Sequence, residues 1–352
     1  MAVGRRFSPL DRVLRLRHDQ WSEGAAQVAT RQGLQAPSFE RAAQAYEQAI
    51  GDKMSADSVQ RITEGFGAAI AEVRSSEVAQ VHELGAAGES PRTSCVQPVA
   101  PISDRASISS DGVMILVRQE GWKEVKVTAI SQVEVRSAGE RTVQTGRRGD
   151  DPLIHLHHSS YQAGLWDADT MARYQYAEGL RRGLQNCPIL SSANDAAGWI
   201  DRITTANFPG IVSVVDWTHA AQRVWAAANA AFDQNSPATQ PWVDARLDAL
   251  WSGKALDVAS AIAALNLDTT VAHQAQGYFE SYHLRMNYPA FRSAGYPIGS
   301  GAVEGANRSV VQQRMKCPGQ GWCRHNAQSV LAALCELHSD RFEIAWKSVP
   351  YA

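Results

Sequence analysis

The chain has 352 residues, of which 44% are hydrophobic and 20% charged, a composition typical of a globular protein with two or three domains. No segment approaches the roughly 18 apolar residues of a transmembrane helix, and the N-terminus lacks the apolar stretch of a signal peptide. We therefore expect no membrane partner and a cytoplasmic location. The net charge of −2 gives no global signature of nucleic-acid binding, so phosphate contacts would come from local groups of cations.

Residues 1–84 are predicted to form a small helical domain. Two short apolar-periodic segments are followed by a turn at residues 51–54, and Ser55 is a suitable N-cap for a third helix from Ala56. This order fits a helix-turn-helix, which would make the segment a DNA-binding domain, and it also fits a helical packing domain without that role. Residues 85–106 are rich in Gly, Pro and Ser and are predicted to be a linker.

Beyond residue 106 the apolar pattern changes to that of strands. Strands are expected at residues 112–117, 122–130, 155–161, 188–192 and 211–215, with helices at 169–184 and 196–205. Three strands, a helix, a strand, a helix and a strand form the order of a ribonuclease-H-like mixed α/β sheet. We assign residues 107–216 and 291–346 to this core and residues 217–290, which are helical by pattern, to an insertion. Residues 328–346 are expected to be one amphipathic helix.

Three carboxylates are the candidate catalytic and metal-binding residues. Asp111 and Asp195 are expected at strand ends, and Glu304 lies on the first turn of a helix after the loop Gly299-Ser300-Gly301. Clustered carboxylates repel unless a cation binds them, and Mg²⁺ (or Mn²⁺) prefers carboxylate oxygens. Two such ions support in-line phosphodiester chemistry. Taken singly, Asp111 also fits an Asp-Gly turn and Asp195 a helix N-cap.

Asp216 and His219 form a second candidate group after the fifth expected strand. One interpretation makes Asp216 the second metal ligand in place of Asp195. Another makes Asp216 and His219 a supporting pair at the root of the insertion. The third is a strand-to-helix turn with an N-cap aspartate and a surface histidine.

A strip of cations follows Glu304 and is the candidate DNA-binding surface: Arg308, Arg314, Lys316 and Arg324. Helical spacing predicts that residues 304, 308, 311 and 315 share one face, which would place Arg308 one turn beyond Glu304. The strip also fits an ordinary solvated helix face. Beside a phosphodiester site, contact with phosphate is the favoured interpretation.

These motifs resemble bacterial insertion-sequence transposases of the ISKra type, within the DDE group. The strongest block runs from Tyr278 to Trp346 and includes Pro297-Ile298-Gly299-Ser300-Gly301, Val303-Glu304-Gly305 and Gln313-Arg314-Met315-Lys316. A second block runs from Asp111-Gly112 to Gly121-Trp122-Lys123, and Asp216-x-x-His219 resembles the D-x-x-H signature of many such enzymes. The resemblance covers residues 8–346 and is weakest before 105.

The resemblance implies a metal-dependent DNA transposase that acts on double-stranded element ends and target DNA as a homo-oligomer. It assigns Asp111, Asp195 and Glu304 to two Mg²⁺ ions and makes Asp216 and His219 the supporting pair. Water would attack phosphorus first and a DNA 3′-hydroxyl second. The family's Gly-Asp-Gly-Ala setting is Asn194-Asp195-Ala196-Ala197 here, and the resemblance implies an N-terminally shortened copy. The alternatives are a ribonuclease-H-fold nuclease without strand transfer and an inactive DNA-binding remnant.

Overall fold

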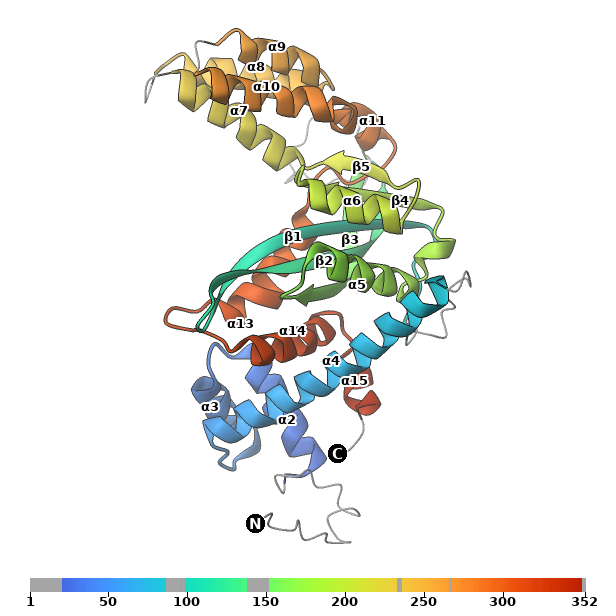
Figure 1. Ribbon diagram of the computed structural model, residues 1–352, viewed down its shortest axis with the longest axis vertical. Helices are drawn as coiled ribbons and strands as arrows, with labels where there is room; N and C mark the ends of the chain where they lie inside the picture. Colours follow the sequence, from blue (N-terminus) through green and yellow to red (C-terminus); the bar gives the residue numbers. More distant parts are fainter. Residues whose placement is uncertain are drawn as a thin grey trace.

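The computed structural model describes residues 21–86, 96, 99–137, 152–232, 236–265 and 268–349. The described chain is elongated, with a helical insertion at one end, a sheet in the middle and the N-terminal helices at the other end (Figure 1). The predicted order of strands and helices in the core is confirmed, and the class is mixed α/β.

Five strands form one mixed sheet in the order β3-β2-β1-β4-β5. The strands are β1 (Arg105–Val117), β2 (Gly121–Arg136), β3 (Leu153–Gly164), β4 (Ile189–Asn194) and β5 (Val212–Val215). The first three pair antiparallel, whereas β4 pairs parallel with β1 and β5 parallel with β4. The apolar runs therefore predict all five strands. Strands β1 to β3 are longer than predicted, because they continue through polar residues at their ends.

Helices cover both faces of the sheet (Figure 1). On one face α5 (Ala168–Arg181) contacts β2 and β3, and α6 (Gly198–Asn207) contacts β1. On the other, a continuous helical segment contacts β1 and β2; it comprises α12 (Gly301–Ala306), the π-helical η6 (Asn307–Gln312) and α13 (Gln313–Met315). Because side chains alternate along a strand, odd-numbered β1 residues such as Val113 and Ile115 pack towards this second layer.

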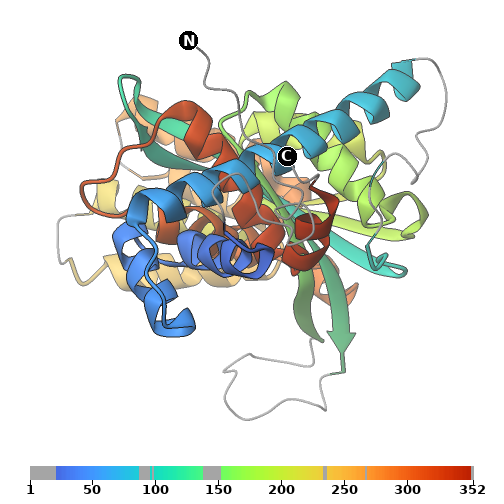
Figure 2. The same ribbon diagram turned by 90° about the horizontal axis from the view of Figure 1, so that it is seen from below.

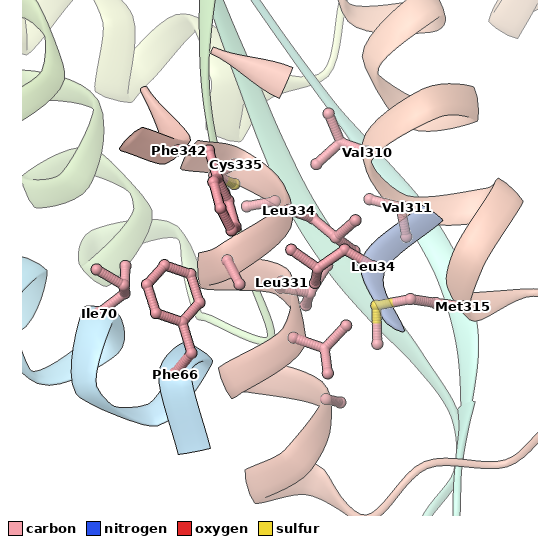
Figure 3. Close-up of a cluster of buried hydrophobic side chains, with 14 of the residues drawn as sticks. Leu34, Phe66, Ile70, Val310, Val311, Met315, Leu331, Leu334, Cys335 and Phe342 are labelled. Atoms are coloured by element: carbon pink, nitrogen blue, oxygen red, sulfur yellow. The ribbon is translucent and has the colours of Figure 1, made fainter. Parts of the chain in front are cut away.

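The N-terminal helices are α2 (Glu23–Gln35), α3 (Phe39–Ile50) and α4 (Ala56–Ala86). They share one hydrophobic core with the C-terminal helices α14 (Arg324–His338) and α15 (Phe342–Ser348), part of which is drawn in Figure 3. The ribbons of α4 and α14 lie side by side (Figure 2). Phe66, for example, lies 5.0 Å from the Trp346 ring. Gly67 permits close approach of α4 to α14, because a Cβ there would lie 2.2 Å from the Ser329 carbonyl oxygen. The described N-terminal helices thus pack in one core with the C-terminal helices.

A DNA-binding role for the described N-terminal helices also has little electrostatic support. Residues 21–86 contain five Lys and Arg residues against nine Asp and Glu residues, a net charge of −4. Helix α4 buries the periodic stripe Val59, Ile62, Phe66 and Ile70. A negatively charged segment repels phosphates, so these helices fit the packing interpretation better than the helix-turn-helix one. Residues 1–20 lie outside the described residues.

The expected insertion begins directly after β5. It consists of α7 (Trp217–Ala231), α8 (Thr239–Trp251), α9 (Ala255–Ala263), α10 (Thr269–Tyr282), η5 (His283–Met286) and α11 (Tyr288–Ser293). These helices have their own apolar cluster, which continues into the sheet at Ala193, Val214 and Val215. Among the described helices, none combines the length and apolar character needed to cross a bilayer.

The C-terminal segment is two helices rather than the single helix expected at 328–346. Helix α14 ends at His338, Asp340 adopts a left-handed φ of 56°, and α15 begins at Phe342. The break places Arg341, which is 4% exposed, between two buried glutamates. Arg341 Nη1 lies 2.6 Å from Glu178 on α5, and Arg341 Nε lies 2.9 Å from Glu336 on α14. A buried ionic network therefore joins α5 to the C-terminal helices.

Candidate active site

Asp111 lies in the middle of β1, at the point where β1 and β4 separate. The prediction that it lies at a strand end or in a turn is wrong, because the serines before it continue the strand. The parallel ladder with β4 ends at Ile108, and the Ser110 amide then donates to the Asn194 side-chain oxygen at 2.6 Å. Asp111 shares the face of Val113 and Ile115, and therefore points towards the α12–α13 layer.

Asp195 directly follows β4, as the sequence predicts. Its Oδ1 accepts a hydrogen bond from the Ala197 amide at 3.1 Å. Burial raises the pKa of the Asp111 carboxyl; hydrogen bonds from Gly112 and Asn307 oppose this shift, and the negative charge of Asp195 adds to it. The two carboxylates are thus close enough to repel each other, a condition that a divalent cation relieves.

The alanines after Asp195, where the transposases that the sequence resembles have glycine, cause no backbone strain. Ala197 has a φ of −68°, and neither it nor Ala196 is among the described residues with a positive φ. The Tyr282 hydroxyl donates to the Ala196 carbonyl at 3.2 Å, which attaches α10 to this loop. The departure from the family pattern therefore leaves the conformation after β4 accessible to L-residues.

Asp216 is 1% exposed and ties the insertion to the sheet. Its Oδ1 accepts from the His219 amide at 2.8 Å as the N-cap of α7, and its Oδ2 accepts from the Ser300 amide at 2.5 Å. Its own amide donates to the Asn194 carbonyl at 2.7 Å. Both carboxylate oxygens thus accept hydrogen bonds from backbone donors.

Glu304 lies on the first turn of α12 and is exposed. Its Oε1 accepts a hydrogen bond from the Ser300 hydroxyl at 3.0 Å. Asp216, His219 and Glu304 each present a ligand atom, and these atoms lie within 4.8 Å of one another. His219 also acts electrostatically on Asp111, whose pKa it lowers against the larger effect of burial. His219 thus belongs to the Glu304 group and also acts electrostatically on Asp111.

Asn307 is a site residue that the sequence did not predict. Its Nδ2 donates to Asp111 Oδ2 at 2.5 Å, and its Oδ1 is buried without a hydrogen-bond partner among the described residues. The prediction that residues 304, 308, 311 and 315 share a face is wrong: Val311 and Met315 are buried, whereas Glu304 and Arg308 are exposed. The wide π-helical turn changes the angular position of the residues after Ala306.

The donor set at this site suits a hard divalent cation. Asp216, His219 and Glu304 form the described group of close ligand atoms, and Asp111 has the unpartnered Asn307 amide oxygen nearby. Mg²⁺ and Mn²⁺ prefer such oxygens. The unpartnered Asn307 oxygen and the Asp195 charge that acts on Asp111 are compatible with a bound cation, and the two-metal set of Asp111, Asp195 and Glu304 stays a prediction.

The four predicted DNA-binding cations have different environments. Arg314 is 2% exposed, donates to the Gly33 carbonyl at 2.7 Å and stacks on Phe39 and Trp322 at 4.4 and 4.9 Å. Burial lowers the pKa of its guanidinium to about 10. The prediction that Arg314 contacts phosphate is therefore wrong for this conformation. Its guanidinium is buried and connects the N-terminal helices to the core.

The other three cations are exposed. Arg324 forms a bidentate ion pair with Glu120, at 2.6 Å for the closest atoms, which offsets its charge. Lys316 lies 5.8 Å from the exposed Trp122 ring. Arg308 makes no ion pair with another described residue, so Arg308 and Lys316 are the members of the strip best placed to meet phosphate.

No family model matches the chain, and a search of curated proteins found no match. Fold geometry and the side chains of the site are therefore the basis for the function proposed below.

Proposed function

We propose that this protein is a DNA transposase whose sheet forms a ribonuclease-H-like core. The observation that supports the proposal is the position of three acidic residues in the fold: Asp111 on the central strand β1, Asp195 directly after the adjacent parallel strand β4, and Glu304 on α12, which contacts β1 and β2. The resemblance to ISKra-type transposases supports the same three residues.

In this proposal, each residue of the site has a separate role. Asp111, Asp195 and Glu304 would hold two Mg²⁺ or Mn²⁺ ions, which when bound activate the attacking oxygen and stabilise the leaving oxygen. Asn307 orients Asp111 by its hydrogen bond. Asp216 fixes the start of α7 and the loop before Glu304, and so positions His219 and Glu304. Arg308 and Lys316 would bind the DNA backbone.

Space for a DNA strand is present on two sides of the α7 start. Thr218 lines a cavity of about 720 Å³ together with Trp217, Trp251 and Gly301, and His219 lines one of about 540 Å³ that begins at Asp195. In this proposal, a strand bound at the carboxylates would extend into these cavities on either side of its scissile phosphate.

The proposal is tested by incubating the purified protein with Mg²⁺ and DNA that carries the inverted repeats flanking its own reading frame. We expect metal-dependent cleavage at the repeat ends and joining of the 3′ ends to target DNA, both measured on sequencing gels. Cleavage without joining would select the nuclease without strand transfer. Specific binding without cleavage would select the inactive remnant, and absence of both would contradict all three functions.

A further inference from the structure

A groove between α7 and α10 begins at Asp195 and runs away from the sheet. Helix α7 lines it with His219, Gln222, Arg223 and Ala226, whose spacing places them on one helix face. Helix α10 lines the other side with Tyr278 and Tyr282, one turn apart. The volume of about 540 Å³ is in the range of small-molecule sites.

The side chains of this groove suit a phosphate and a ring. Arg223 is exposed and lies 5.3 Å from the Tyr278 ring centroid, and it forms no ion pair with another described residue. Burial raises the pKa of Tyr278 to about 12, Arg223 opposes this shift, and the Asp195 charge increases it. Both Arg223 in the groove and Asp195 at its inner end therefore act electrostatically on Tyr278.

We propose that the α7–α10 groove is a nucleotide subsite, in which Arg223 binds the phosphate next to the scissile one. This inference rests on the proposed function, because the scissile phosphate itself would lie on the metals held by Asp111, Asp195 and Glu304. A guanidinium binds phosphate oxygens in a bidentate manner. The faces of Tyr278 and Tyr282 accept the sugar and base between the two phosphates. The insertion thereby contributes directly to substrate binding.

Thymidine 3′,5′-bisphosphate is a minimal probe because it carries two phosphates on one nucleoside, and thymidine 5′-monophosphate carries one. Binding of each is measured by calorimetry in Ca²⁺, which carboxylate oxygens bind. We expect the wild type to bind the bisphosphate at least about tenfold more tightly than the monophosphate. Arg223→Gln should remove this advantage while binding the monophosphate as the wild type does.

Arg246→Gln is the matched control, because Arg246 stacks on Trp242 at 4.9 Å within the same insertion but does not line the groove. It should keep the preference for the bisphosphate. Asp111→Asn tests the underlying site and should abolish Ca²⁺-dependent binding of both nucleotides. If Arg223→Gln keeps the preference while Asp111→Asn loses binding, the subsite is wrong and the metal site stands. If Asp111→Asn binds both nucleotides normally, the proposed function itself is overturned.

Discussion

Replacing Glu304 by Gln is expected to slow metal-dependent cleavage of element ends at least about a thousandfold. The substitution keeps the size and shape of the side chain but removes the charge that would bind the metal. Metal stabilisation of the transition state is worth several kcal/mol, and each 1.4 kcal/mol or so is a factor of ten in rate. Single-turnover cleavage in Mg²⁺ measures the effect.

Folding and DNA binding should survive this substitution. Glu304 is exposed, and its hydrogen bond from the Ser300 hydroxyl can be kept by a glutamine oxygen. DNA affinity should stay equal or increase, because a negative charge near the phosphates is lost. Glu83→Gln, on an exposed position of α4, removes the same charge elsewhere and should cleave normally. Cleavage at the wild-type rate by Glu304→Gln would show that Glu304 has no catalytic role.

Replacing Arg341 by Met should lower the free energy of unfolding by about 3–5 kcal/mol, because it leaves two buried glutamates without their shared partner. Glu178 and Glu336 are 0% and 1% exposed, and both lie within 3 Å of the Arg341 guanidinium. Urea unfolding monitored by tryptophan fluorescence measures the loss. Arg202→Met, which breaks an exposed pair with Asp169, should cost less than about 1 kcal/mol.

The same network predicts how stability responds to acid. Burial alone would raise the pKa of Glu336, but Arg341 and Arg74 outweigh it and hold that pKa at about 2. A carboxyl whose pKa is depressed in the folded state contributes stability above its unfolded pKa of about 4.3 and loses it as the pH falls towards 2. The wild type should lose this contribution between those values, and Arg341→Met should already lack the part that Arg341 supplies at pH 7, because only Arg74 then pairs with Glu336. Equal acid sensitivity of the two proteins would contradict the role of Arg341.

The sequence predicted the strands of the sheet and the positions of Asp195 and Glu304 in the fold because these features have local signals. Strands β1 to β5 contain apolar runs or alternation that distinguish them from the helices around them. Glu304 follows a Gly-Ser-Gly loop and Asp195 directly follows β4, so each occupies the position that its neighbours indicate. Asp111 is also a candidate from the sequence. The polar serines before it give no apolar signal, so the first half of β1 is not predicted.

Non-local packing explains what the sequence did not predict. In the sequence, Arg314 belongs to a strip of cations that fits a helix surface. It is buried because Gly33, Phe39 and Trp322, which lie far away in the sequence or in another element, pack around its guanidinium. Asn307 contacts Asp111 only because its helix packs against β1, and the sequence around Asn307 gives no sign of that long-range contact. Likewise, the pattern of α4 predicts a helix but not that its apolar stripe packs on α14.

Crystals soaked in Mn²⁺ test the metal site most directly, because anomalous scattering locates each ion. We predict two ions roughly 4 Å apart, coordinated by Asp111, Asp195 and Glu304. Asp216→Asn should keep both ions, since Asp216 is occupied by the His219 and Ser300 amides, whereas Asp195→Asn should lose at least one. A single ion on Asp216, His219 and Glu304, with none on Asp111 and Asp195, would contradict the proposed two-metal centre.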